Sequence, residues 1–167
     1  KVMSVGSADN DFLSRIFGTE EFDYRNFDLK NLDYAKIADQ HLVFLNELQA
    51  VPNSLTTSLK SFADDGGSVV VVPSIRSDLN SYNGFLANLM GTTITQLVTI
   101  ERNITKINFS HALYRNVFEK NVTNFQYPKI SRYYRVRTSR PNVLSLQDND
   151  PFLIGTNGKY LFTAAIN

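Results

Sequence analysis

Four consecutive valines, Val69–Val72, constrain the fold of this 167-residue chain more than any other feature of its sequence. Successive side chains of a β-strand point to opposite faces of the sheet, so a strand of valines is apolar on both faces. Such strands are typical of parallel sheets that helices cover on both sides. The valines therefore predict an α/β protein in which both faces of this strand are covered.

The residues before the valines complete a strand–helix–strand unit. His41–Asn46 is predicted to be a strand, and a helix then starts at Pro52. Apolar residues recur at helical spacing between Leu55 and Ala63, and Gly66-Gly67 ends the helix. A helix between two strands is the unit from which parallel sheets are built.

Two further helices are predicted. Phe12, Leu13, Ile16 and Phe17 fall on one face of the first helix, which ends at Gly18. The other helix runs from about Asn80 to Met90, with Tyr82, Phe85, Leu86, Leu89 and Met90 facing inward.

The second half of the chain predicts strands that alternate apolar and polar residues, as half-buried strands do. Asn157-Gly158 favours a type I′ hairpin, because both positions of that turn need positive φ. We expect one α/β domain over residues 1–167, a flavodoxin-like three-layer sandwich with a mostly parallel central sheet and antiparallel additions in the second half. The expected strands are Lys1–Val5, Phe22–Phe27, His41–Asn46, Val69–Val72, Ile94–Ile100, Ile104–Phe109, Ile130–Val136, Val143–Leu146, Phe152–Ile154 and Tyr160–Ile166.

Ligands of open α/β sheets bind outside the carboxyl ends of the strands. The polar residues predicted at those ends are the candidate ligand-binding residues. They are Ser7, Asn46, Glu47, Ser74 and Arg76.

The chain contains no cysteine, which excludes disulfides, thiolate metal sites and a cysteine nucleophile. A nucleophile elbow would follow the Val69–Val72 strand, but Ser74 there lacks the small neighbours that such a strained turn requires. His41 comes just before Leu42–Leu45, the apolar part of its strand, and is expected at the opposite edge of the sheet from Ser74, which leaves His111 as the base for a serine nucleophile. We expect Ser74 to be a turn residue and the protein not to be an enzyme; a divergent hydrolase using Ser74 with His111 is the alternative.

Asp9 and Asp11 are open to two interpretations. They can cap the helix that follows them, or hold Mg²⁺ together with Glu47. We favour capping and expect neither a metal nor a cofactor. A carbohydrate- or nucleotide-binding domain is a weaker option.

The stretch Lys129–Arg137, with Arg140, is basic and aromatic, as in proteins that bind single-stranded nucleic acid. On one strand, however, these side chains alternate between two faces, and the sequence pI of about 8.1 is below the usual basic range of nucleic-acid-binding domains. We therefore expect no nucleic-acid partner. A protein partner would use this strand or the carboxyl edge of the sheet.

Three segments carry a family resemblance. They are the strand–helix–strand unit His41–Pro73, the Phe109–Phe118 segment and Asn142–Ala165. Together they resemble the class I glutamine amidotransferase-like domain of Bat-type aerotolerance membrane proteins of bacteria. This resemblance implies a flavodoxin-like fold and an extracytoplasmic, periplasmic module that membrane helices tether.

Glutamine amidotransferases use an elbow cysteine, followed later in the chain by a histidine and an acid. Here the cysteine is absent, and no histidine follows the Tyr160–Ile166 strand. The resemblance therefore implies a non-catalytic interaction or ligand-sensing module, excised from a larger membrane-anchored protein. Its implied partners are other protein domains of a membrane-associated complex.

Overall fold

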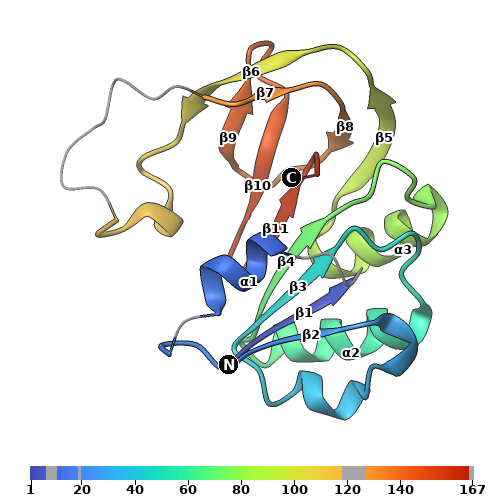
Figure 1. Ribbon diagram of the computed structural model, residues 1–167. Coiled ribbons are helices and arrows are strands. Elements are labelled where there is room, and N and C mark those ends of the chain that lie inside the picture. Colours follow the sequence, from blue (N-terminus) through green and yellow to red (C-terminus); the bar gives the residue numbers. More distant parts are fainter. Residues whose placement is uncertain (7–10, 19, 118–126, 166–167) are drawn as a thin grey trace.

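A nine-stranded sheet forms the body of the computed structural model, which describes residues 1–6, 11–18, 20–117 and 127–165 (Figure 1). Its order is β2-β1-β3-β4-β11-β10-β9-β6-β7. The five strands from β2 to β11 run parallel, and each later neighbour is antiparallel to the strand before it. In sheet order the bounds are β2 (Tyr24–Phe27), β1 (Val2–Gly6), β3 (Leu42–Asn46), β4 (Ser68–Val72), β11 (Lys159–Phe162), β10 (Pro151–Thr156), β9 (Asn142–Leu146), β6 (Arg102–Ile107) and β7 (Lys129–Ile130).

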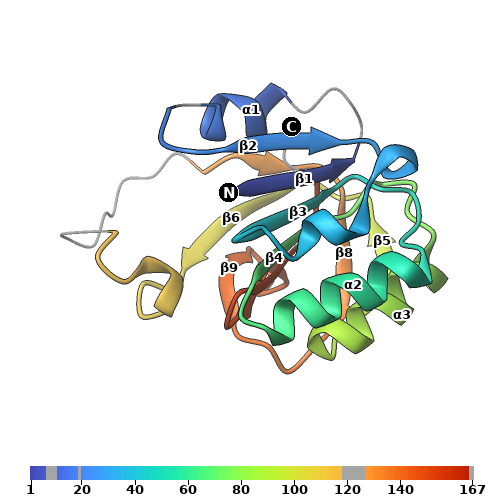
Figure 2. The same cartoon turned by 90° about the horizontal axis from the view of Figure 1, so that it is seen from below.

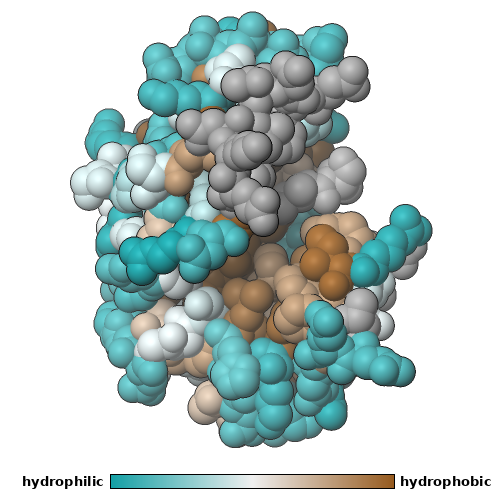
Figure 3. Space-filling model, turned by 90° about the vertical axis from the view of Figure 1, so that its left-hand side faces the viewer, coloured by the Kyte–Doolittle hydropathy of each residue, from teal (hydrophilic) through white to brown (hydrophobic). Residues whose placement is uncertain are grey.

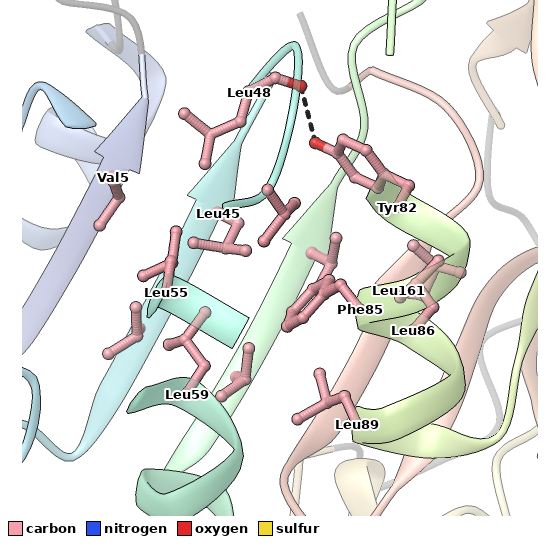
Figure 4. Close-up of a cluster of buried hydrophobic side chains, with 14 of the residues drawn as sticks. Val5, Leu45, Leu48, Leu55, Leu59, Tyr82, Phe85, Leu86, Leu89 and Leu161 are labelled. Carbon is pink, nitrogen blue, oxygen red and sulfur yellow. Dashed lines mark hydrogen bonds between the residues drawn. The ribbon is translucent and has the colours of Figure 1, made fainter. Parts of the chain in front are cut away.

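The main core lies on the face of the sheet that α2 (Asn53–Asp64) and α3 (Leu79–Met90) cover. Alternate residues of the central strands face these helices and are completely buried, among them Leu45, Val69 and Val71. Figure 4 shows leucines of α2 and aromatic residues of α3 meeting these strands. The hydroxyl of Tyr82 at the edge of this core donates to the Leu48 carbonyl oxygen at 2.8 Å.

Local signals set the ends of these helices. The Asp78 side chain accepts a hydrogen bond from the Asn80 backbone N–H, which caps α3 at its start. Gly91 ends α3 with a φ of 64°, in the left-handed conformation that glycine adopts at low cost. Gly66, with a φ of 95°, plays the same part just after α2.

The opposite face of the sheet is covered differently. Figure 2 shows α1 (Asp11–Phe17) on one side of the parallel strands and both longer helices on the other. Among the side chains of α1, Leu13 is buried, with 1% exposure, whereas Ile16 is 57% exposed. The predicted apolar face of α1 is therefore buried only in part, because no second α-helix lies beside this seven-residue helix within the described residues.

A second, two-stranded sheet pairs β5 (Thr93–Val98) with β8 (Tyr133–Arg137). It packs on the antiparallel half of the main sheet around a smaller core. That core consists of Val98, Ile104, Tyr133, Leu146, Phe152 and Ala164. Tyr133 and Arg135 both donate to the Asp150 carboxylate, at 2.7 and 3.0 Å, and so join β8 to the start of β10.

The predicted α/β fold with a mostly parallel sheet and antiparallel additions is confirmed. The Asn157-Gly158 turn joins β10 to β11 with φ values of 50° and 74°, as the hairpin signal predicts. The single strand expected at Ile130–Val136 is wrong, because the chain leaves the main sheet after Ile130 and enters the second sheet at Tyr133. The expected strand Tyr160–Ile166 is shorter and ends at Phe162.

Short helices complete the described chain, and one of them is η3 (Ala112–Tyr114). Its companions are η1 (Leu29–Asn31) and η2 (Tyr34–Ile37). Across the described ranges, no helix combines the length and the apolar character that crossing a membrane requires.

Candidate functional site

The carboxyl edge of the parallel sheet brings together part of the predicted site. Asn46 ends β3 and is buried, and Glu47 follows it with a φ of 54°. The Glu47 backbone N–H donates to the Val72 carbonyl oxygen at 2.8 Å, which joins the ends of β3 and β4. Ser7, the candidate after β1, lies outside the described residues, as does Asp9.

Glu47 holds the unusual backbone conformation at this edge. A left-handed φ is uncommon for a residue with a side chain and is found at tight turns and functional sites. The strand-end residue with this conformation thus follows β3, whereas the only position considered for an elbow from the sequence was after β4. The sequence does not predict a left-handed residue after β3, because the position is occupied by Glu47 and not by a glycine.

Ser74 is a turn residue in this structure. Its Oγ accepts a hydrogen bond from the Arg76 backbone N–H at 3.2 Å, and its carbonyl oxygen accepts from the Ser77 N–H and the Tyr134 hydroxyl. The Arg76 side chain is exposed. These three hydrogen bonds of Ser74 hold the loop after β4 in place.

Two buried hydroxyls reinforce the same edge. Burial raises the pKa of Tyr82 far above its usual value, and burial is also the main reason why the pKa of Tyr134 is raised. Both groups therefore stay protonated and act as donors, Tyr82 to the Leu48 carbonyl and Tyr134 to the Ser74 carbonyl. They hold the loops after β3 and β4 in place.

His111 is bound through both ring nitrogens to the backbone. Nε2 lies 2.9 Å from the Gly155 carbonyl oxygen, and Nδ1 accepts from the Leu113 N–H at 3.1 Å. A carbonyl oxygen only accepts, so Nε2 carries the proton and the ring is a neutral imidazole. The hydrogen bonds of the Ser74 Oγ and of the His111 ring thus go to backbone groups and do not join the two residues.

No cluster of three His, Asp or Glu side chains that could hold a metal ion occurs within the part of the chain that the structure describes.

Several basic side chains of Lys129–Arg137 and Arg140 form ion pairs or hydrogen bonds within the domain. Lys129 pairs with Glu101 at 2.9 Å, Arg135 binds Asp150, and the Arg140 Nε donates to the Met90 carbonyl at the end of α3. Because the stretch is also split between two sheets, these cations do not line a single strand.

An apolar cleft on the α1 face of the sheet was not predicted. It has a volume of about 310 Å³, and hydrophobic side chains gather in a hollow on the side of the molecule that Figure 3 shows. Of its ten lining residues, only Tyr160 carries a polar side-chain group. We call this site the α1 cleft; it is lined by Phe12, Leu13, Ile16, Phe17, Phe44, Val70, Leu113, Leu153, Tyr160 and Phe162.

The α1 cleft is lined by residues of five elements, α1, β3, β4, β10 and β11, together with η3. Phe17 packs on Phe44 of β3, with ring centroids 5.5 Å apart, and so sets α1 against the sheet. Leu113 reaches the cleft from η3, which His111 ties to β10 through Gly155. The apolar face of α1 was the available sequence signal, but it equally predicted a helix buried in the core.

Comparisons with known proteins concern the fold. No family model and no curated protein matches the sequence. A ThuA-like protein from Bacteroides uniformis has a TM-score of 0.66 over 98% of this chain and 80% of its own, at 11% identity. A glutamine amidotransferase from Thermotoga maritima has a TM-score of 0.58 over 97% of this chain and 74% of its own, at 10% identity.

The fold is glutamine amidotransferase-like. A β-galactosidase from the psychrophilic Marinomonas ef1 also contains it, with a TM-score of 0.66 and 13% identity over the whole of this chain. This chain spans only 26% of that enzyme. The glutamine amidotransferase-like fold thus also occurs as one part of a much longer protein, and a shared fold at such low identity carries no activity with it.

Proposed function

We propose that this domain is a non-catalytic interaction module of a larger, membrane-anchored bacterial protein of the Bat type. The single observation that carries the proposal is the α1 cleft, an apolar surface of a kind that marks binding sites in folded proteins. Its partners are other protein domains of a membrane-associated complex. A ligand-sensing role at the carboxyl edge would use Asn46, Glu47, Ser74 and Arg76.

The chemistry of the polar groups supports binding over catalysis. Acyl transfer by a serine needs a base within hydrogen-bond reach of its hydroxyl. Here the Ser74 Oγ accepts from a backbone N–H, and both nitrogens of His111 are engaged by backbone groups. The sequence also has no cysteine to take the role of the amidotransferase nucleophile.

A hydrolysis assay tests this part of the proposal. Purified protein and the Ser74→Ala variant are incubated with glutamine and with p-nitrophenyl acetate. We expect both proteins to hydrolyse these compounds at the same rate as a buffer blank. A rate above the blank that Ser74→Ala removes would establish the hydrolase in place of the interaction module.

The extracytoplasmic location follows from the resemblance of His41–Pro73, Phe109–Phe118 and Asn142–Ala165 to the Bat-type domain. The absence of cysteine makes a direct test possible. Thr57→Cys adds a thiol at an exposed position of α2 in the full-length gene product. We expect a membrane-impermeant maleimide to label this thiol in intact cells, with the unmodified gene product as control, and labelling only after lysis would refute the location.

A further inference from the structure

The two faces of the parallel sheet are covered to different extents. Two helices of 12 residues each, α2 and α3, cover one face, whereas the seven-residue α1 covers the other. As a result Val69 and Val71 are fully buried, while Phe44 and Val70 on the α1 face remain half-buried. Within the described residues, α1 is the only α-helix on this face (Figure 2), in the layer where this class of fold carries helices on both sides of the sheet.

Exposed apolar side chains gather at the same place. Ile16 from α1 and Leu113 from η3 both line the α1 cleft and are 57% and 41% exposed. Phe22, which is 41% exposed, packs edge-on against Phe17 of the lining. Single exposed apolar residues are ordinary, but a contiguous group around a cleft is typical of an interaction surface.

The size of the α1 cleft argues against a second copy of the domain as its occupant and in favour of a partner that inserts a few apolar side chains. Ten residues line it, whereas a stable dimer interface uses roughly 20–30 residues on each side. Its volume of about 310 Å³ is about twice the ~150 Å³ of an apolar cavity that holds one benzene. The cleft is therefore too small to hold two copies of the domain together by itself, yet large enough for more than one apolar side chain.

A small apolar ligand fits the lining less well. Small-molecule pockets carry a few polar groups that orient the ligand, and here Tyr160 alone has such a group. A small ligand inside the cleft would also leave the outer surfaces of Ile16 and Leu113 in water.

We propose that the α1 cleft receives one amphipathic helix of a partner protein. This inference rests on the proposed function, because it assigns a surface and a partner chemistry to the interaction module. Apolar residues at positions i, i+3, i+4 and i+7 of the incoming helix fill the cleft. The helix body covers Ile16 and Leu113 and completes the helical layer on this face.

The test uses two synthetic peptides of about 18 residues, a length at which an alanine-rich peptide is helical in water. Both consist of alanine, lysine and four leucines; one places the leucines at i, i+3, i+4 and i+7, and the other spreads them around the helix. Binding is measured by fluorescence polarisation with the wild-type domain and with Ile16→Glu and Ile100→Glu. Ile100 is the matched control, because it is 52% exposed and does not line the cleft.

We expect the patterned peptide to bind about tenfold more tightly than the spread peptide. Ile16→Glu should weaken its binding by about tenfold, and Ile100→Glu should leave it within about twofold. Urea unfolding midpoints of both variants confirm that the substitutions leave the fold intact, which their exposure favours.

Several results would overturn the inference. They are an absence of peptide binding, equal binding of both peptides, or an equal loss in both variants. A concentration-dependent dimer in sedimentation velocity that Ile16→Glu abolishes would assign the cleft to a second copy. Stabilisation by laurate that Ile16→Glu abolishes would assign it to a small apolar ligand. None of these results affects the hydrolysis assay, so a failed helix site and a failed interaction module are distinguishable.

Discussion

Substitutions of His111 test whether this histidine stabilises the fold or acts as a catalytic base. His111 is buried, with 8% exposure, and its ring joins two backbone groups, the Gly155 carbonyl and the Leu113 N–H. It thereby places Leu113 on the wall of the α1 cleft. Two substitutions separate these contacts: His111→Ala removes both, whereas His111→Asn keeps a side-chain oxygen that can accept from Leu113, as asparagine does at helix caps.

The magnitudes follow from the contacts. The hydrogen bond to Gly155 is worth about 1 kcal/mol, and the cap on η3 about 1 kcal/mol. The edge-on contact with Tyr160, whose ring centroid lies 6.2 Å away, adds about 1 kcal/mol. We therefore expect His111→Ala to lower the free energy of unfolding by about 3 kcal/mol and His111→Asn by about 2 kcal/mol.

Urea unfolding followed by circular dichroism measures both values, and hydrogen exchange of the Leu113 amide reports on the cap. This amide should stay protected in His111→Asn and lose protection in His111→Ala. The reasoning is refuted if both variants unfold within about 0.5 kcal/mol of the wild type, which is the range of ordinary surface substitutions. A hydrolase activity that His111→Asn removes at unchanged stability would instead make His111 a base.

Three further predictions concern stability. Gly84→Ala should raise the free energy of unfolding by about 1 kcal/mol, because Gly84 lies in α3 with open space around its Cα; a chemical denaturation curve measures this. Gly155→Ala should lower it by about 3 kcal/mol in the same assay, because the φ of Gly155 is 144° and an added Cβ would overlap the Lys159 carbonyl oxygen. Burial alone would raise the pKa of Asp150, but hydrogen bonds from Tyr133 and Arg135 outweigh it and lower this pKa. The stability that ionised Asp150 provides is therefore present above about pH 4 and is lost as the pH falls through the folded pKa, so unfolding midpoints of Asp150→Asn should decline less between about pH 5 and pH 2 than those of the wild type.

Much of the parallel half was predictable because its signals are local. Val69–Val72 are apolar on both faces whatever surrounds them, and Gly91 and Asn157-Gly158 supply the positive φ values that their turns need. The route of the chain at Ser131 and Arg132 was not predictable. Both sides of that break have strand-forming residues, and only their distant partners, Arg102 for Ile130 and Val98 for Tyr133, assign them to different sheets.

The candidate site was predicted in part. Asn46, Glu47 and Ser74 do lie at the carboxyl edge, because parallel strands end on one side of their sheet. The left-handed conformation of Glu47 has no signature in a sequence without glycine at that position. The engagement of His111 by Gly155 joins residues 44 positions apart, which no local pattern encodes.

The sequence by itself determined the class of fold, the ends of the main helices and the absence of a thiol, because each depends on the identity of neighbouring residues. The tertiary structure alone decided that the apolar face of α1 forms one wall of an open cleft. A helix has the same apolar pattern whether its partners bury it fully or in part. How much of that face is left open depends on which distant elements pack beside it, and here Phe44, Tyr160 and Leu113 arrive from three separate parts of the chain.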